Sequence, residues 1–315
     1  ILEIIIYAAM VYAVKWKAER NLERVGKIFM DRLHEANQVI LAKMREIPGL
    51  EDADTIKTCL IPVTPTLAQL QVGGEHGDDV FGAADLRRFH DAIDAHAHFV
   101  HERKGQLRLT RGGEDDPLRG DGVTGRKDLA GFLGWDAPHR DPFREVLCHP
   151  KLVPYLHDLV GPGYRLDHNP LCIMQDPGAE GFEFHGGSTL DDGSWNHPLG
   201  YDFKHGKMRC NLLAFAVHLT DTRENDGGFC IVRGSHKSNF RCPPEMRRLE
   251  TAREHAYQPA IKAGSVVVFT EATTHGTLPW RGSTQRRNLI YRFSPATGAY
   301  GRGWAENGGW PASYL

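Results

Sequence analysis

The spacing of apolar residues changes about half-way along the chain, and the change predicts helices first and strands afterwards. From residue 15 to about residue 44, apolar side chains recur at helical spacing and no proline interrupts them. The segment 47–66, "IPGLEDADTIKTCLIPVTPT", then contains three prolines and a glycine, as is typical of a linker. We therefore predict a helical N-terminal extension over residues 1–60 and a main domain over residues 61–315.

Helical spacing returns in the first part of this main domain. It predicts helices over about 83–104 and 141–160. The stretch between them, 105–142, is rich in glycine and charge, so we expect a surface loop there.

After residue 164 the apolar runs become short and are bounded by Gly, Pro and Asp, which is typical of strands. The runs are "NLLAFAVHL" (211–219), "GGFCIV" (227–232), "AGSVVVFT" (263–270) and "NLIYRFS" (288–294). No helix of crossover length separates them, which favours a sandwich or barrel over a doubly wound sheet. The sequence thus predicts a mostly β fold with flanking helices and a barrel core at about 164–295.

The charge balance narrows the range of partners. Lys and Arg total 38 against 40 Asp and Glu, and the two signs are interspersed along the chain. This balance produces no positive electrostatic field that would attract nucleic acid or an anionic membrane. A small molecule is therefore the expected partner. Six cysteines occur without C-x-x-C spacing, which favours reduced thiols and an intracellular, cytoplasmic location.

The first 14 residues, "ILEIIIYAAMVYAV", are mostly apolar but include Glu3. They are shorter than the roughly 20 residues that span a bilayer. A buried or partner-facing helix is the favoured interpretation. Membrane attachment through residues 1–14 and a trimmed targeting segment are the alternatives.

The search for catalytic motifs leaves mainly the histidines. The chain contains no G-x-S-x-G, G-x-x-x-x-G-K-[ST], G-x-G-x-x-G or H-E-x-x-H motif. His185 ends an apolar stretch and His275 directly follows a predicted strand. Such strand ends converge at the mouth of a barrel, where binding sites are common.

Four stretches together resemble the phytanoyl-CoA dioxygenase family across about residues 80–300: "HPKLVPYLHDLVGPGYRLDHN", "FHGG", "LTDTRENDGGFCIVRGSHKSN" and "AGSVVVFTEATTHGTLPWRGSTQRRNLIYRFSP". The resemblance implies a double-stranded β-helix, that is, a jelly-roll or cupin-like barrel. It also implies a non-haem oxygenase that uses Fe(II), 2-oxoglutarate and O2. On the family's pattern, His185 and His275 correspond to iron ligands and Arg286 to the 2-oxoglutarate-binding arginine, with Arg287 as runner-up.

One position departs from that pattern, because the family's H-x-D pair would place an aspartate where this chain has Gly187. Chloride has the charge of the missing carboxylate and fits its space. Iron-dependent halogenases similar to this family carry Gly or Ala at this position. We therefore favour slightly the interpretation that a halide ion binds the iron and that the enzyme is a halogenase. Alternatively, Asp191 or Asp192 folds back to complete the iron site of a hydroxylase. A third possibility is a non-catalytic binding module. A turn with positive φ at Gly187 is compatible with all three.

The sequence therefore predicts an enzyme that functionalises a C–H bond of a small or acyl-type substrate. The substrate itself is not encoded in a recognisable motif, because specificity resides in loops such as 105–142 and 188–205.

Overall fold

The structure of the protein is a computed structural model that describes residues 80–103, 116–190, 192–204, 207–238 and 240–298, together with the backbone of residues 69–72. The predicted helical extension over residues 1–60, including the apolar residues 1–14, lies outside the described residues. So does Asp191.

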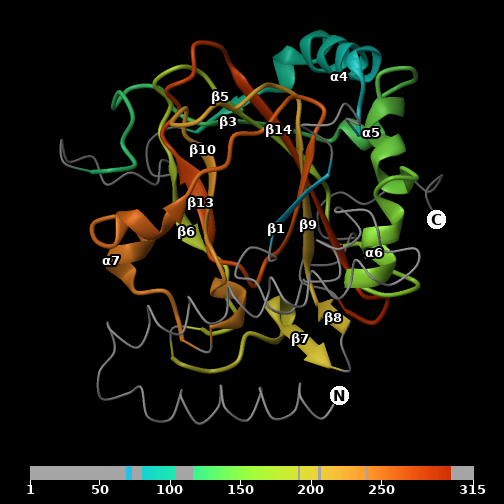
Figure 1. Ribbon diagram of the computed structural model, residues 1–315. Coiled ribbons are helices and arrows are strands. Elements are labelled where there is room, and N and C mark those ends of the chain that lie inside the picture. The colour runs from blue at the N-terminus through green and yellow to red at the C-terminus, as the bar shows by residue number, and fades with distance from the viewer. Residues whose placement is uncertain are drawn as a thin grey trace, which may run out of the picture. The chain divides into compact units, whose positions relative to one another are not determined.

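Two antiparallel β-sheets face each other and enclose the interior of the domain (Figure 1). The larger sheet has eight strands: β1 (Gln69–Val72), β12 (Val266–Thr270), β9 (Leu213–His218), β14 (Arg286–Ser294), β5 (Leu171–Gln175), β3 (Lys127–Ala130) and β2 (His101–Glu102) in that order, with β4 (Arg165–Leu166) joined to β14. The smaller sheet has four: β11 (Ala256–Tyr257), β10 (Gly228–Val232), β13 (His275–Leu278) and β6 (Phe182–His185). A hairpin of β7 (Tyr201–Lys204) and β8 (Lys207–Cys210) is separate from both. This is a jelly-roll-type fold, which agrees with the sandwich or barrel that the strand pattern predicted and with the jelly roll that the resemblance implied.

Side chains alternate between the two faces of the larger sheet. Ala214 and Ala216 of β9 point inward, where they pack with Phe269 of β12 and with Phe229 and Ile231 of the smaller sheet. Because the side-chain period of a strand is two, the residues between them point outward. The interior thus receives side chains from both sheets.

Helices cover the outward face of the larger sheet (Figure 1). They are α4 (Ala83–Ala95), α5 (Asp141–Glu145) and α6 (Val153–Leu159), whereas the short α7 (Pro244–Arg247) lies beside β6. Short 3-10 turns occur at Ala97–Phe99, Phe132–Gly134, Val146–Cys148, His197–Leu199, Ser235–Lys237 and Arg253–His255. Phe89 of α4 and Phe143 of α5 pack in one cluster with Phe215 and Tyr291, and the Tyr291 hydroxyl donates to the Phe143 carbonyl oxygen at 2.8 Å.

The four predicted strand runs are confirmed as β9, β10, β12 and β14, but the helix predictions were too long. The first helix ends at Ala95, and β2 follows it. The second divides into α5, a 3-10 turn and α6, because His149 has an extended backbone before Pro150, as a residue that precedes proline prefers. The expected loop 105–142 contains β3, whose Leu129 is buried.

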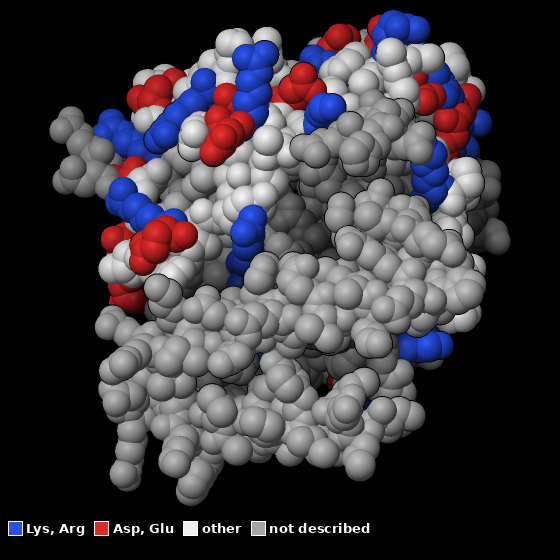
Figure 2. Space-filling view, in the orientation of Figure 1, with Lys and Arg blue, Asp and Glu red and all other residues white. Residues whose placement is uncertain are grey.

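Within the described ranges no helix has both the length and the apolar character needed to cross a membrane. Figure 2 shows acidic and basic side chains interspersed over the described part of one face.

Candidate metal and cosubstrate site

His185 and His275 face each other on neighbouring strands of the smaller sheet. His185 is the last residue of β6 and His275 the first of β13, and the antiparallel register pairs the two directly. Their ring centroids are 4.2 Å apart. Cross-strand pairing thus brings together two imidazoles that are far apart in the sequence.

Both imidazoles are oriented in the same way by backbone carbonyl groups. His185 Nδ1 donates to the Glu183 carbonyl oxygen at 3.1 Å, and His275 Nδ1 donates to the Thr273 carbonyl oxygen at 2.8 Å. A proton on Nδ1 leaves the lone pair on Nε2, and histidines that bind metals commonly have their other ring nitrogen fixed in this manner. Each ring therefore offers Nε2 as a ligand atom.

A carboxylate joins the two histidines. Glu271, His185 and His275 each present a ligand atom, and these atoms lie within 4.8 Å of one another. Glu271 directly follows β12 and is buried, with 4% exposure, and its Oε2 lies 3.5 Å from His275 Nε2. Two imidazoles and one carboxylate are the donor set of non-haem Fe(II) sites.

Sequence reasoning missed Glu271, although it lies inside the quoted stretch "FTEATTHG". The only signal was an acid four residues before the second histidine. That spacing has a fixed geometry in a helix but not across a turn between two strands. The turn at 271–274 is what places the carboxylate beside His275.

Gly186 and Gly187 form a tight backbone turn directly after His185. Both have positive φ, at 90° and 100°, so the backbone turn that was compatible with each interpretation of Gly187 is present. A Cβ on Gly186 would lie 2.5 Å from the Thr273 carbonyl oxygen and 2.7 Å from that of Glu271. The Gly187 N–H also donates to the Glu271 carbonyl oxygen at 3.1 Å. The glycine pair thus lets the end of β6 turn tightly against the loop that carries Glu271.

The acids suggested as substitutes in the sequence are not part of this cluster as far as it is described. Asp192 is exposed, and its Oδ1 accepts hydrogen bonds from the Ser194 backbone N–H at 2.9 Å and from the Ser194 hydroxyl at 2.6 Å. Asp191 lies outside the described residues. The carboxylate that the structure brings to the histidines is instead that of Glu271, in the turn between β12 and β13.

The electrostatics of the cluster suit a cation. Burial, with a smaller effect of the neighbouring His275, lowers the pKa of His185 to about 3, and burial also lowers the pKa of His275. Burial raises the pKa of Glu271, but the charge of Arg292 and the nearby histidines outweigh it, so this pKa falls to about 2. At neutral pH the site therefore holds two neutral imidazoles and one carboxylate, the states that bind metals.

Arg286 and Arg287 point to opposite faces of β14. Arg287 is on the outer face, where its Nη2 lies 2.6 Å from Asp94 Oδ1 and its Nε donates to Gln285 Oε1 at 2.7 Å. Arg286 is buried, with 1% exposure, and its Nη1 donates to Gln175 Oε1 at 2.9 Å. The structure thus directs Arg286 inward and leaves Arg287 bound to a helix.

Arg286 is a buried cation whose nearest partners are neutral. In the amide orientation that satisfies both groups, the Asn288 oxygen accepts from Arg286 Nη2 at 3.0 Å. Arg286 Nε and both ring nitrogens of the buried His218 have no hydrogen-bond partner among the described residues. Burial lowers the pKa of Arg286 to about 10, so it stays charged at neutral pH. Burying a guanidinium without an anionic partner costs free energy, so this position suits an anionic ligand.

Gly228 of β10 covers this guanidinium. A Cβ at position 228 would lie 2.8 Å from Arg286 Nε and 3.0 Å from its Cδ. The glycine therefore allows Arg286 to extend across the interior against the smaller sheet.

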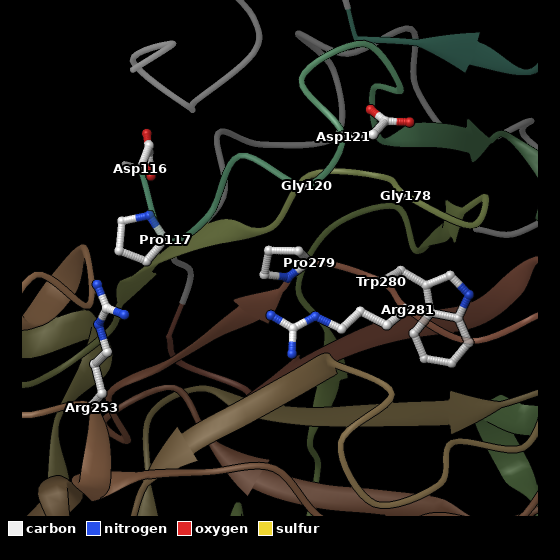
Figure 3. A pocket seen from close by; sticks show the side chains of 9 residues that line it. All are labelled: Asp116, Pro117, Gly120, Asp121, Gly178, Arg253, Pro279, Trp280 and Arg281. Carbon is white, nitrogen blue, oxygen red and sulfur yellow. The ribbon is translucent and has the colours of Figure 1, made fainter. Parts of the chain in front are cut away.

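Two cavities differ in their chemistry. One of about 340 Å³ opens onto His185 and Glu271 and is lined further by Leu190, Leu199, Arg241 and Arg247, among others. A second, of about 530 Å³, adjoins Pro279, Trp280 and Arg281, beyond the opposite end of β13 from His275. In Figure 3 the Arg281 guanidinium extends toward the side of this hollow where Arg253 lies. Of the two, the smaller cavity is the one lined by His185 and Glu271 of the candidate metal site.

Several solved structures are similar to this chain in fold. HygX from Streptomyces hygroscopicus, with nickel, 2-oxoglutarate and hygromycin B bound, is 20% identical and has a TM-score of 0.57, with 75% of this chain and 86% of HygX covered. AviO1 from Streptomyces viridochromogenes Tue57 is 16% identical with a TM-score of 0.50, covering 74% of this chain and 92% of AviO1. The epimerase SnoN, in complex with Fe3+, alpha ketoglutarate and nogalamycin RO, is 16% identical with a TM-score of 0.50, covering 78% and 86%. Among curated proteins, none matches.

A family model matches the part of the chain that contains the fold and the candidate site. The model described as phytanoyl-CoA dioxygenase matches residues 74–288, well over half of the chain. The match spans both histidines, Glu271 and Arg286. The chain therefore belongs to the phytanoyl-CoA dioxygenase family and is an enzyme of that Fe(II)- and 2-oxoglutarate-dependent class.

Proposed function

We propose that the protein is an oxygenase in which His185, Glu271 and His275 bind Fe(II) and Arg286 binds the distal carboxylate of 2-oxoglutarate. The single observation that carries this proposal is the convergence of the three ligand atoms within 4.8 Å. The Nδ1 hydrogen bonds of both histidines support it, because they leave each Nε2 free to bind the metal. Three protein ligands leave three adjacent metal positions for a chelating 2-oxo acid and O2.

The chain's own residues bind the metal and the cosubstrate, orient them and exclude water from the site. When bound, Fe(II) and 2-oxoglutarate supply the oxidising chemistry with O2 that a protein side chain cannot. Arg286 matches the planar carboxylate of the cosubstrate with a permanently charged guanidinium fork. The apolar side chains of Phe229, Phe269 and Ile290 keep the interior between the sheets dry.

Glu271 favours oxygen insertion over halogenation. The halide interpretation required an anionic metal position that the polypeptide leaves vacant beside the histidines. Glu271 supplies a carboxylate with that charge next to His275. We therefore propose hydroxylation or a related oxidation of a C–H bond, without chloride as a ligand.

The substrate that we propose is a small molecule with a polar or anionic portion. The cavity of about 340 Å³ at His185 and Glu271 is of the size that holds such a molecule. Arg241 and Arg247 line it together with the apolar Leu190 and Leu199. The printed ligands of HygX and SnoN, hygromycin B and nogalamycin RO, are also small molecules.

Metal-dependent binding of 2-oxoglutarate tests the proposal. We expect the full chain to bind 2-oxoglutarate by calorimetry only in the presence of Fe(II) under anaerobic conditions, or of Ni(II). Glu271→Gln should weaken metal binding by more than roughly 100-fold, since even partners of metal ligands contribute 10- to 100-fold. Asp191→Asn and Asp192→Asn each remove one carboxylate, as Glu271→Gln does, but these variants should bind metal and 2-oxoglutarate as the wild type does.

Three other results would contradict parts of the proposal. Loss of metal in Asp191→Asn with retention in Glu271→Gln would transfer the carboxylate role to Asp191. A wild-type chain that binds 2-oxoglutarate equally well without metal, and forms no succinate in air, would be a binding module. Product formation that needs chloride would restore the halide interpretation.

A further inference from the structure

The two oxygens of the Glu271 carboxylate face different partners. Oε1 accepts a hydrogen bond from Arg292 Nε at 2.5 Å. Oε2 points toward His275 and lies 3.5 Å from its Nε2. One oxygen is thus engaged by the protein, and the other is on the side of the two histidines.

Arg292 reaches this carboxylate from β14, a strand of the same sheet as β12, and its guanidinium has a second contact beyond Glu271. It lies on β14, directly opposite Ala214 of β9, and its side chain is 20% exposed. Its Nη1 lies 3.4 Å from His168 Nε2, and His168 Nδ1 lies 2.7 Å from Asp167 Oδ2. Asp167 is buried, with 2% exposure. With the His168 proton on Nδ1, the imidazole donates to Asp167 and accepts from Arg292.

The flexibility of glutamate makes such support necessary. Glutamate has one more rotatable bond than the aspartate of an H-x-D pair, so its carboxylate has more orientations available. A free carboxylate can bind a metal through one oxygen or through both. Binding through both would occupy one of the three positions that the 2-oxo acid and O2 require.

We propose that Arg292 is a positioning residue that restricts Glu271 to coordination through Oε2 alone. This inference rests on the proposed function. The hydrogen bond to Oε1 removes that oxygen from competition for the metal, and the contacts with His168 and Asp167 keep Arg292 in place. The network Asp167–His168–Arg292–Glu271 thereby keeps three metal positions open for the 2-oxo acid and O2.

A purely structural role, in which Arg292 only neutralises a buried acid, predicts a loss of stability but no change in coordination. The test therefore measures coordination directly. Arg292→Gln, Arg292→Lys and wild type are saturated with Fe(II) anaerobically, and 2-oxoglutarate is added while the visible charge-transfer band of its chelate is recorded. Arg287→Gln is the matched control, since Arg287 is on the outer face of the same strand and pairs with Asp94.

We expect Arg292→Gln to retain metal at saturation but to bind 2-oxoglutarate roughly 10- to 100-fold more weakly, with a shifted or weakened band. Arg292→Lys, which keeps one donor and the charge, should recover most of the wild-type band. Arg287→Gln should match the wild type. A folded Arg292→Gln protein with wild-type affinity and spectrum overturns the inference.

If Arg292→Gln fails to fold, His168→Gln replaces it, because this change loosens only the far end of Arg292. A band shifted in the same direction supports the inference, and an unchanged band and affinity overturn it. A wild-type protein that shows no metal-dependent binding of 2-oxoglutarate contradicts the proposed function instead, so the two failures are distinguishable.

Discussion

At the scale of single residues, the site depends on a pair of glycines and an acid that the family pattern does not lead one to expect. Gly186 and Gly187 form a turn with positive φ, and Glu271 provides the carboxylate from the loop that this turn contacts. The resemblance to the family identified His185 and His275 as a pair, and their positions at predicted strand ends, which converge at a barrel mouth, supported it. Glu271 could not be identified in this way, because the geometry of its turn is not a property of local spacing.

Substitution of Gly187 separates the backbone role of this residue from a ligand role. The space around a Cβ at position 187 is open, so the cost of any side chain there comes from the positive φ. We expect Gly187→Ala and Gly187→Asp each to lower the free energy of unfolding by on the order of 1–3 kcal/mol, measured by urea denaturation. The two variants should also bind metal equally well. An affinity at least 10-fold higher for Gly187→Asp would show that an acid at this position does reach the metal.

At the scale of elements, strand alternation decides which arginine is available to a cosubstrate. Neighbouring residues on β14 point to opposite faces, so the sequence reduced the choice to Arg286 or Arg287 without settling which points inward. Packing of α4 on the outer face settles the directions, because Asp94 of that helix binds Arg287. The helix boundaries were predicted less well, since the local spacing of apolar residues does not show where β2 and Pro150 end the predicted helices.

The two arginines should therefore respond differently to the same substitution. We expect Arg286→Gln to raise the dissociation constant of 2-oxoglutarate by on the order of 100-fold, because truncating one partner of a buried, hydrogen-bonded charge pair costs several kcal/mol. Arg287→Gln should leave that constant nearly unchanged, and calorimetry with Ni(II) measures both. Equal effects of the two substitutions would contradict the assignment of Arg286.

At the scale of the whole molecule, several histidines are buried in the neutral form. Burial lowers the pKa of His236 to about 4, and burial together with the charge of Arg286 lowers that of His218 well below its usual value. His236 packs edge-on against Tyr201, with ring centroids 4.9 Å apart. Unfolding would expose these rings and allow them to take up protons.

Acid should therefore destabilise the metal-free protein before its carboxylates titrate. A histidine whose pKa is lowered in the folded state binds its proton only in the unfolded chain between pH 6.5 and about pH 4. Stability then falls as the pH drops through this window, by up to about 1.4 kcal/mol per pH unit for each such histidine. Urea midpoints at pH 7, 6 and 5 measure the slope, and His236→Gln should reduce it. The same slope in wild type and variant would show that His236 does not contribute.

The sequence by itself determined four of the strands and the alternation of their faces, because these follow from local apolar runs and a periodicity of two, and the resemblance to the family indicated the pair of histidines. Only the tertiary structure decided that His185 lies opposite His275, that α4 binds Arg287 on the outer face, and that Glu271 and Arg292 meet. These arrangements depend on strand register and on contacts between side chains that are distant in the sequence. Contacts between distant segments are selected by the packing of the whole domain, which no local pattern contains.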